Sequence, residues 1–297
     1  MQYTTLGDNA LKVPLLCLGS MTWGSQNTTA EGHEQISMAL ANDLNFIDTA
    51  EMYPVAPTKE TQGLTEQYIG SWLKARGNRS DLVLASKVAG RAQWLPWIRK
   101  GPTLTRANIE EAINGSLQRL QTDYLDLYQV HWPDRNTNYF GQLGYSEKND
   151  DWAVPIAETL ETLHDLVRAG KIRHIGLSNE TPWGLSEYLK LSEKHGWPRP
   201  QSIQNPYNLL NRSFEVGLSE FSHREQVGLL AYSPLAFGVL TGKYANGALP
   251  EGARLALWDR FDRYNNPVGR EAADAYFAVA DKHGLDRAQM ALAWVNS

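Results

Sequence analysis

Four polar residues stand at or just beyond the ends of short apolar runs in this sequence. They are Asp48 and Tyr53 in Phe-Ile-Asp-Thr-Ala-Glu-Met-Tyr (46–53), Lys87 at the end of Leu-Val-Leu-Ala-Ser-Lys (82–87), and His131 at the end of Tyr-Leu-Asp-Leu-Tyr-Gln-Val-His (124–131). The runs have the composition of buried strands. A charged group where a buried strand stops is costly unless it faces a cleft. We therefore expect the four side chains to share one active site.

These residue types suit assisted proton donation. A tyrosine hydroxyl has a reference pKa of about 10, and a neighbouring ammonium stabilises the phenolate that donation leaves behind. Lys87 could supply that ammonium, and Asp48 could pair with it. His131 could donate a hydrogen bond to a substrate oxygen as negative charge develops there. Any one of these residues alone usually makes only a local hydrogen bond, but the four together favour a function.

Other kinds of site lack their motifs in this chain. No Ser-His-Asp or Cys-His arrangement provides a nucleophile. The seven histidines show neither His-x-His nor His-Glu-x-x-His spacing, so we expect no metal site. No Gly-x-Gly-x-x-Gly follows the first strand, which argues against a doubly wound dehydrogenase.

The composition bounds the class of protein. A chain of 297 residues with 42% apolar content can bury a large core in one domain, 1–297. With a net charge of −5, the chain lacks the excess of basic residues that is typical of proteins that bind nucleic acid or an anionic membrane. Cys17, the only cysteine, lies in an apolar run and is predicted to be a small buried hydrophobe. With no secretory signal and no apolar stretch near ~20 residues, we expect a cytoplasmic protein, monomeric by default.

Short apolar runs alternate with amphipathic segments along the chain. Residues 2–6 and 11–13 around Gly7-Asp8-Asn9 are typical of a hairpin. Seven later runs are predicted to be strands: 15–18, 46–47, 82–85, 124–130, 172–177, 202–204 and 227–231. Helical spacing of apolar residues marks the segments 36–44, 68–73, 109–120, 156–167, 185–191 and 288–294.

Apolar strands that alternate with helices predict parallel βα units. Seven right-handed crossovers favour a closed barrel. We expect a (β/α)8 TIM barrel with an N-terminal β-hairpin, whose eighth strand is not included in this chain. Three long loops (54–63, 92–100 and 133–152) each follow a strand, and the last two carry aromatic residues. In a barrel they lie at the carboxyl face, where active sites are found.

The chain resembles the aldo-keto reductases over its whole length. The matching segments, in the family's order, are 46–53, Ala85-Ser86-Lys87, 116–131, Gly176-Leu-Ser-Asn179, Gln204-Asn-Pro-Tyr207 and Tyr232-Ser-Pro-Leu-Ala-Phe-Gly-Val-Leu-Thr-Gly-Lys-Tyr244. The resemblance implies a (β/α)8 barrel with NADPH/NADP as the hydride-carrying cofactor. It places Asp48, Tyr53, Lys87 and His131 on the four catalytic positions, with Tyr53 as the proton donor.

The resemblance also implies cofactor and substrate contacts. The cofactor-binding positions would be Ser20, Met21, Asp48, Ser178, Asn179, Gln204, Tyr232, Ser233, Pro234, Leu235, Ala236, Phe237, Gly238, Val239, Leu240, Thr241, Gly242, Lys243, Tyr244 and Arg254. Within this set the amide and hydroxyl groups would hold the nicotinamide carboxamide, Tyr232 would stack on the ring, and 233–243 would cradle the pyrophosphate. Trp23, Trp94 and Trp132 are candidates for the substrate pocket, although Trp23 is as readily a core residue. The residues that bind the 2′-phosphate in the family lie beyond Ser297. The preference for NADP over NAD is therefore implied by the resemblance alone.

The main functional hypothesis is an NADPH-dependent reduction of an aldehyde or ketone. An alternative is an NADP(H)-binding regulatory subunit with little turnover, as relatives of this fold serve channels. A barrel hydrolase is a third possibility, but it lacks a nucleophile or metal set. The physiological substrate and the direction of reaction are not encoded in recognisable motifs.

Overall fold

The computed structural model describes residues 1–8, 11–77 and 79–297. The chain forms two compact units, residues 1–204 with 221–229 and residues 205–220 with 230–297. The single domain expected over 1–297 stays a prediction.

A hairpin precedes the main sheet. β1 (Tyr3–Leu6) pairs antiparallel with β2 (Leu11–Pro14), which confirms the predicted hairpin. Asn9 of the predicted turn lies outside the described residues. Gly7 has a left-handed φ of +65°, and a Cβ there would lie 1.9 Å from the side-chain oxygen of Gln201. Glycine therefore allows both the turn and its close approach to the strand that carries Gln201.

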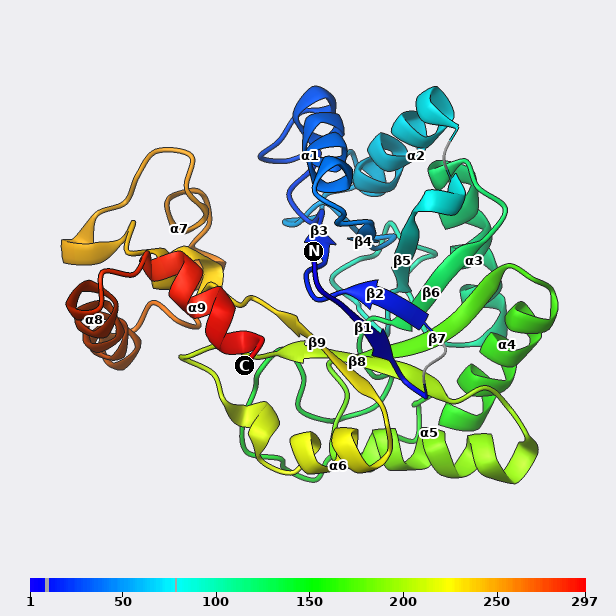
Figure 1. Ribbon diagram of the computed structural model, residues 1–297. Helices are drawn as coiled ribbons and strands as arrows, with labels where there is room; N and C mark the ends of the chain where they lie inside the picture. Colours follow the sequence, from blue (N-terminus) through cyan, green and yellow to red (C-terminus); the bar gives the residue numbers. More distant parts are fainter. Residues whose placement is uncertain (9–10, 78) are drawn as a thin grey trace. The chain divides into compact units, whose positions relative to one another are not determined.

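The main sheet holds seven strands in chain order. They are β3 (Leu18–Gly19), β4 (Phe46–Asp48), β5 (Val83–Val88), β6 (Leu125–Val130), β7 (Ile172–Ser178), β8 (Pro200–Pro206) and β9 (Gly228–Tyr232). The strands are parallel, and the sheet curls into a half-barrel (Figure 1). The predicted α/β class is confirmed, and the arrangement is consistent with the (β/α)8 fold.

Helices follow the strands as predicted. Their bounds are α1 (Thr29–Ala41), α2 (Leu64–Arg76), α3 (Arg106–Leu120), α4 (Ile156–Arg168), α5 (Pro182–His195) and α6 (Leu218–Arg224). Helices α1 to α5 lie outside the sheet, each packed against the next (Figure 1). The spacing of Ile109, Ile113 and Leu120 buries one face of α3, because residues three or four apart share a side of a helix. Gly170, at φ +72°, ends the turn after α4.

The strand register sets polar side chains at one level of the sheet. Lys87 on β5 is level with Gln129 on β6, and Gln129 is level with Gly176 on β7. A Cβ at Gly176 would lie 2.6 Å from Ser202 Oγ and 3.1 Å from Gln129 Cγ. The missing side chain at Gly176 therefore leaves room for the amide of Gln129 inside the curled sheet.

The second unit is largely helical. It contains α7 (Arg254–Leu257), α8 (Pro267–Lys282) and α9 (Arg287–Val295), together with short 3-10 turns. The predicted helix at 288–294 is confirmed as α9. The Tyr207 ring stacks on Trp294 of α9 with ring centroids 5.0 Å apart, which joins the two segments of this unit.

The start of the barrel sheet differs from the prediction. The run 15–18 was expected to be a strand, but β3 contains only Leu18 and Gly19. Leu15 and Leu16 are exposed, and so is Cys17, so the prediction that Cys17 is buried was wrong. The reason is that β3 is the edge of the sheet in the described part of the chain, with β4 as its neighbour, and leaves these side chains uncovered. Over the same described ranges, no helix combines the length and the apolar character needed to cross a bilayer.

Candidate active site

The structure brings the four predicted catalytic residues together. Asp48 ends β4, Lys87 lies near the end of β5, and His131 directly follows β6. Lys87 Nζ lies 2.5 Å from Asp48 Oδ2 and 3.5 Å from the hydroxyl of Tyr53. The Tyr53 ring meets the His131 imidazole edge-on, with centroids 5.7 Å apart. Three strand ends and one loop therefore supply a single polar cluster at the carboxyl edge of the sheet.

Asp48 is the hydrogen-bonding centre of this cluster. Its Oδ1 atom accepts hydrogen bonds from Gln129 Nε2 at 2.9 Å and from Gln204 Nε2 at 3.0 Å. Lys87 also donates to the Thr49 carbonyl at 2.8 Å. Gln129 was missed in the sequence because an amide inside an apolar strand carries no motif. The signal that could have found it is its position two residues before His131, on a run that is otherwise buried.

Lys87 is a fully buried ammonium. Burial opposes its protonation, but the Asp48 carboxylate, and to a lesser degree Tyr53, outweigh that effect and raise the pKa of Lys87. The side chain is therefore charged at neutral pH. A fixed positive charge 3.5 Å from the Tyr53 hydroxyl favours loss of the phenolic proton.

The pKa of His131 shifts in the opposite direction to that of Lys87. Burial, and then the positive charge of Lys87, hold the pKa of His131 well below its ordinary value of 6.5. The imidazole is therefore neutral at pH 7, with one N–H donor and one acceptor nitrogen. Its Nδ1 atom has no hydrogen-bond partner among the residues that the structure describes. A neutral imidazole can donate to a carbonyl oxygen without adding a second cation beside Lys87.

We expect His131 to make the stability of the fold depend on pH. Because its pKa is lower in the folded chain than in the unfolded chain, the free energy of unfolding should fall as pH drops below about 6.5, by up to about 1.4 kcal/mol per pH unit from this residue. Urea unfolding at pH 7.5, 6.5 and 5.5, for the wild type and for His131→Gln, measures that contribution. Equal pH slopes for the two proteins would contradict a buried neutral His131.

A buried ion pair braces the loops around Tyr53. Both carboxylate oxygens of Glu51 accept from the guanidinium of Arg99, at 2.6 and 2.7 Å. Glu51 Oε1 also accepts from the Ala89 backbone N–H at 2.8 Å, and Arg99 Nε donates to Asn108. This pair therefore ties the β4 loop that carries Tyr53 to the end of β5 and to the loop 92–100. Sequence reasoning missed it, because 48 residues separate the partners.

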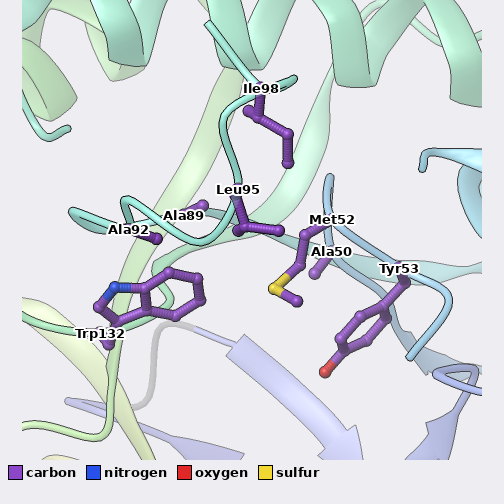
Figure 2. Close-up of a cluster of buried hydrophobic side chains, with 8 residues drawn as sticks. All are labelled: Ala50, Met52, Tyr53, Ala89, Ala92, Leu95, Ile98 and Trp132. Carbon is purple, nitrogen blue, oxygen red and sulfur yellow. The ribbon is translucent and has the colours of Figure 1, made fainter. Parts of the chain in front are cut away.

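An apolar cluster lies beside the same loops. It contains Ala50, Met52, Tyr53, Ala89, Ala92, Leu95, Ile98 and Trp132. Figure 2 shows Leu95 between the indole of Trp132 and the side chain of Met52, with the Tyr53 ring beyond Met52. The Tyr53 ring is thus held by packing, while its hydroxyl belongs to the polar cluster.

Arg99→Met should destabilise the fold strongly. It would leave the carboxylate of Glu51, which is 1% exposed, without its cation, at a cost of about 3–5 kcal/mol. The double variant Glu51→Gln/Arg99→Met should recover most of this loss, because no buried charge remains. Urea unfolding of the two proteins tests the idea, with Lys190→Met as the control. Its exposed pair with Glu187 should contribute no more than about 1 kcal/mol. If Arg99→Met were as stable as Lys190→Met, the Glu51–Arg99 pair would not contribute to the stability of the fold.

Several residues predicted to bind the cofactor join the cluster in the first unit. Ser20 Oγ donates to the Asp48 carbonyl, and Ser178 Oγ donates to the Gln204 carbonyl. Asn179 Nδ2 donates to the His131 carbonyl at 2.9 Å. Met21 is half-buried against the apolar cluster. These bonds fix the hydroxyl of Ser20 beside Asp48 and the polar groups of Ser178 and Asn179 beside Gln204 and His131, a set that suits a carboxamide ligand.

The other predicted cofactor residues belong to the second unit. Ala236, Val239, Leu240 and Tyr244 are buried, so their side chains serve packing and only their backbone could meet a ligand. The half-buried or exposed members are Tyr232, Ser233, Pro234, Leu235, Phe237, Gly238, Thr241, Gly242, Lys243 and Arg254. Positive φ angles at Ser233, Ala236, Phe237, Gly238 and Gly242 bend this segment into successive tight turns. Turns of this kind expose backbone N–H groups, which suits an anion such as a pyrophosphate.

The three tryptophans proposed for the substrate pocket differ in their surroundings. Trp23 is 1% exposed, packs on α1 and donates its indole N–H to Gln35, so the structure favours the core alternative for it. Trp132 is also buried, and its ring lies 4.8 Å from that of His131. Trp94 is 46% exposed and stacks on Trp132. Across the ranges that the structure describes, no cluster of three or more His, Cys, Asp or Glu side chains could hold a metal ion.

Comparisons with known proteins show the family to which the chain belongs. The model of the aldo/keto reductase family matches residues 15–297. The chain is 56% identical to Protein tas of Escherichia coli (strain K12) over 99% of its length and 86% of that protein. It is 33% identical to the aldo-keto reductase YhdN of Bacillus subtilis (91% of the chain, 75% of that protein). It is also 30% identical to a probable voltage-gated potassium channel subunit beta of Arabidopsis thaliana (100% and 84%). The chain therefore belongs to the aldo/keto reductase family and is an oxidoreductase by that membership.

Proposed function

We propose that the chain reduces an aldehyde or ketone to an alcohol with NADPH. The observation that carries this proposal is the Tyr53 hydroxyl 3.5 Å from the buried ammonium of Lys87, which is itself paired with Asp48. That arrangement is suited to a general acid whose conjugate base is stabilised in place. Family membership supports a nicotinamide cofactor, and the preference for NADPH is part of the proposal.

Each residue of the cluster has its own role in the proposed reaction. His131 donates to the carbonyl oxygen of the substrate and polarises it. Bound NADPH would supply a hydride from nicotinamide C4 to the carbonyl carbon. Tyr53 gives its phenolic proton to the oxygen as charge develops there, and Lys87 stabilises the phenolate that remains. Asp48, held by Gln129 and Gln204, keeps the ammonium in place. Tyr53 recovers its proton from solvent when the alcohol leaves.

The chain offers groups that fit the cofactor. Asn179, Ser178 and Gln204 form a hydrogen-bonded series of amide and hydroxyl groups that ends at Asp48, and we assign them to the nicotinamide carboxamide. The turns at 233–243, with Lys243 and then Arg254, suit the pyrophosphate. These assignments predict micromolar or tighter binding of NADPH, which quenching of tryptophan fluorescence would measure.

A panel of aldehydes and ketones tests the reaction itself. Turnover is followed at the nicotinamide absorbance with NADPH and NADH in parallel. Faster turnover with NADPH supports the proposal, and turnover with NADH alone would contradict the cofactor preference. The absence of turnover with every carbonyl would contradict the reductase.

A regulatory subunit is the second candidate, because relatives of the chain are named potassium channel β subunits. The intact cluster of Asp48, Tyr53, Lys87 and His131 favours the enzyme. A protein that co-purifies in fixed stoichiometry, together with negligible turnover across the panel, would favour the regulator. We further propose a cytoplasmic monomer without nucleic-acid or membrane partners, in keeping with the net charge of −5.

A further inference from the structure

A hollow lies close to the catalytic cluster, within the first unit. It has a volume of about 670 Å³, within the range of clefts that hold drug-sized molecules. Its walls come from the loops after β5 and β6. The side chains that matter here are the cations Arg91, Arg135 and Lys148 and the aromatic residues Trp94, Tyr139 and Trp152. The catalytic mechanism uses none of these residues.

Contacts between aromatic rings connect this hollow to the catalytic cluster. Trp94, in the wall, stacks on Trp132 with centroids 6.0 Å apart and an interplanar angle of 25°. Trp132 also meets the His131 ring, with centroids 4.8 Å apart, and the Phe140 ring, at 5.5 Å. The Trp132 indole N–H donates to the backbone carbonyl of Arg91 at 3.1 Å. Trp94 thus borders the hollow, and the buried Trp132 lies between it and the imidazole that would polarise a carbonyl group.

The Arg91 guanidinium is held in a fixed position on the wall. Its Nε atom donates to Asp134 at 2.6 Å, one Nη atom donates to the Trp152 carbonyl at 3.0 Å, and the group lies 4.7 Å from the Trp152 ring centroid. The remaining Nη1 atom has no hydrogen-bond partner within the described ranges, and the side chain is 32% exposed. Arg91 therefore presents one guanidinium edge that is oriented in advance and free to bind an anion.

The charged side chains that line the hollow are all cations. Asp134 and Glu180 pair with Arg91 and Arg135 but are only 4% exposed, so they lie behind the cations. Lys148 is exposed and has no ion pair among the described residues. No Asp or Glu occurs among the residues that line the hollow. Guanidinium donors over aromatic faces are the chemistry that recognises a planar ring bearing a carboxylate.

We propose that this hollow binds the carboxylate end of the substrate, and that the preferred substrates are aromatic aldehydes or ketones that carry a carboxylate. This inference rests on the proposed carbonyl reduction. The aromatic ring would lie along Trp94, the carbonyl would face His131, and the carboxylate would meet Arg91 and Lys148. The hydride and the proton are delivered as in the proposed reaction, so the hollow adds recognition and no chemical step.

Two aldehydes of similar shape test the proposal, 4-carboxybenzaldehyde and its methyl ester, with benzaldehyde as the reference that lacks the para group. We expect kcat/KM for the acid to exceed that for the ester about tenfold or more, mainly through KM, as for a charge-assisted hydrogen bond. The advantage should shrink as ionic strength rises, because part of the site is exposed. 4′-Formylbiphenyl-4-carboxylate, a longer acid, measures the reach of the hollow. Equal kcat/KM values for acid and ester in both lengths would overturn the proposal.

Variants locate the effect. Arg91→Gln alone would leave Asp134 buried without its cation, so the variant used is Arg91→Gln/Asp134→Asn, which keeps the shape and removes both charges. We expect its acid-to-ester ratio to fall to about one. Lys148→Met should lower the ratio by a smaller factor, and Lys190→Met on α5 serves as the matched surface control. A double variant that keeps the wild-type ratio would refute the role of Arg91.

A binding measurement separates this inference from the proposed function. Terephthalate cannot be reduced under these conditions. It should bind the wild type, which quenching of tryptophan fluorescence would measure, and it should bind the double variant more weakly. If the wild type reduces none of the aldehydes but binds terephthalate through Arg91, the reductase is wrong and the carboxylate site stands. If the aldehydes are reduced without regard to charge and terephthalate does not bind, the reductase stands and the carboxylate site is wrong.

Discussion

Tyr53→Phe should lower kcat for carbonyl reduction about 10²- to 10⁴-fold and leave the affinity for NADPH nearly unchanged. The substitution removes only the hydroxyl that lies 3.5 Å from Lys87 Nζ. The ring itself stays in its apolar cluster beside Met52 (Figure 2), so the fold and the cofactor groups should be preserved. Steady-state kinetics with an aromatic aldehyde and NADPH titration by fluorescence provide the two measurements.

Tyr124→Phe is the matched control for Tyr53→Phe. Tyr124 precedes β6 at its amino end, away from the carboxyl edge, and its ring lies between Arg79 and Arg173. Removing that hydroxyl should leave kcat at the wild-type value. Full activity of Tyr53→Phe would rule out Tyr53 as the proton donor, and parallel losses in both variants would point to a general effect of the substitution.

Lys87→Met should damage both catalysis and stability. It removes the cation that favours the phenolate of Tyr53, so kcat should fall about 10²- to 10⁴-fold. It also leaves Asp48, which is 8% exposed, without the ammonium that lies 2.5 Å away. Breaking a buried ion pair from one side costs about 3–5 kcal/mol. Gln129 and Gln204 still donate to Asp48 and would moderate this loss.

A double variant separates the two effects of Lys87. Lys87→Met/Asp48→Asn removes both charges, so urea unfolding should show most of the stability restored. Turnover should stay as low as in the single variant, because the cation beside Tyr53 is still missing. Recovery of turnover along with stability would mean that Lys87 acts only on the fold and has no role in proton transfer.

The strands and helices could be predicted largely from local patterns. Alternating apolar runs and helical faces, such as that of Ile109 and Ile113, depend on residues close together in the chain. The exposed Cys17 could not be predicted in this way. Its apolar neighbours are those of a buried strand, and only the pairing of strands shows that the neighbouring β3 lies at the edge of the sheet.

Only part of the candidate site could be predicted, because local patterns reveal some of its residues and not others. Polar residues at the ends of apolar runs identify Asp48, Lys87 and His131, since parallel strands bring their carboxyl ends to one edge. Gln129 and the Glu51–Arg99 pair carry no local signal. Gln129 matters only because the register sets it beside Asp48, and Arg99 matters only because its loop returns to Glu51.

The sequence by itself determined the alternation of strands and helices, the family of the chain and the four residues on which the proposed chemistry depends. These follow from short-range periodicity and from motifs, both of which can be recognised without a third dimension. Only the tertiary structure decided that Lys87 is a buried cation, that His131 is neutral, and that Arg91 presents a free edge beside Trp152. Charge states and anion sites depend on burial and on partners from distant loops, and those are set when the sheet curls and its loops pack.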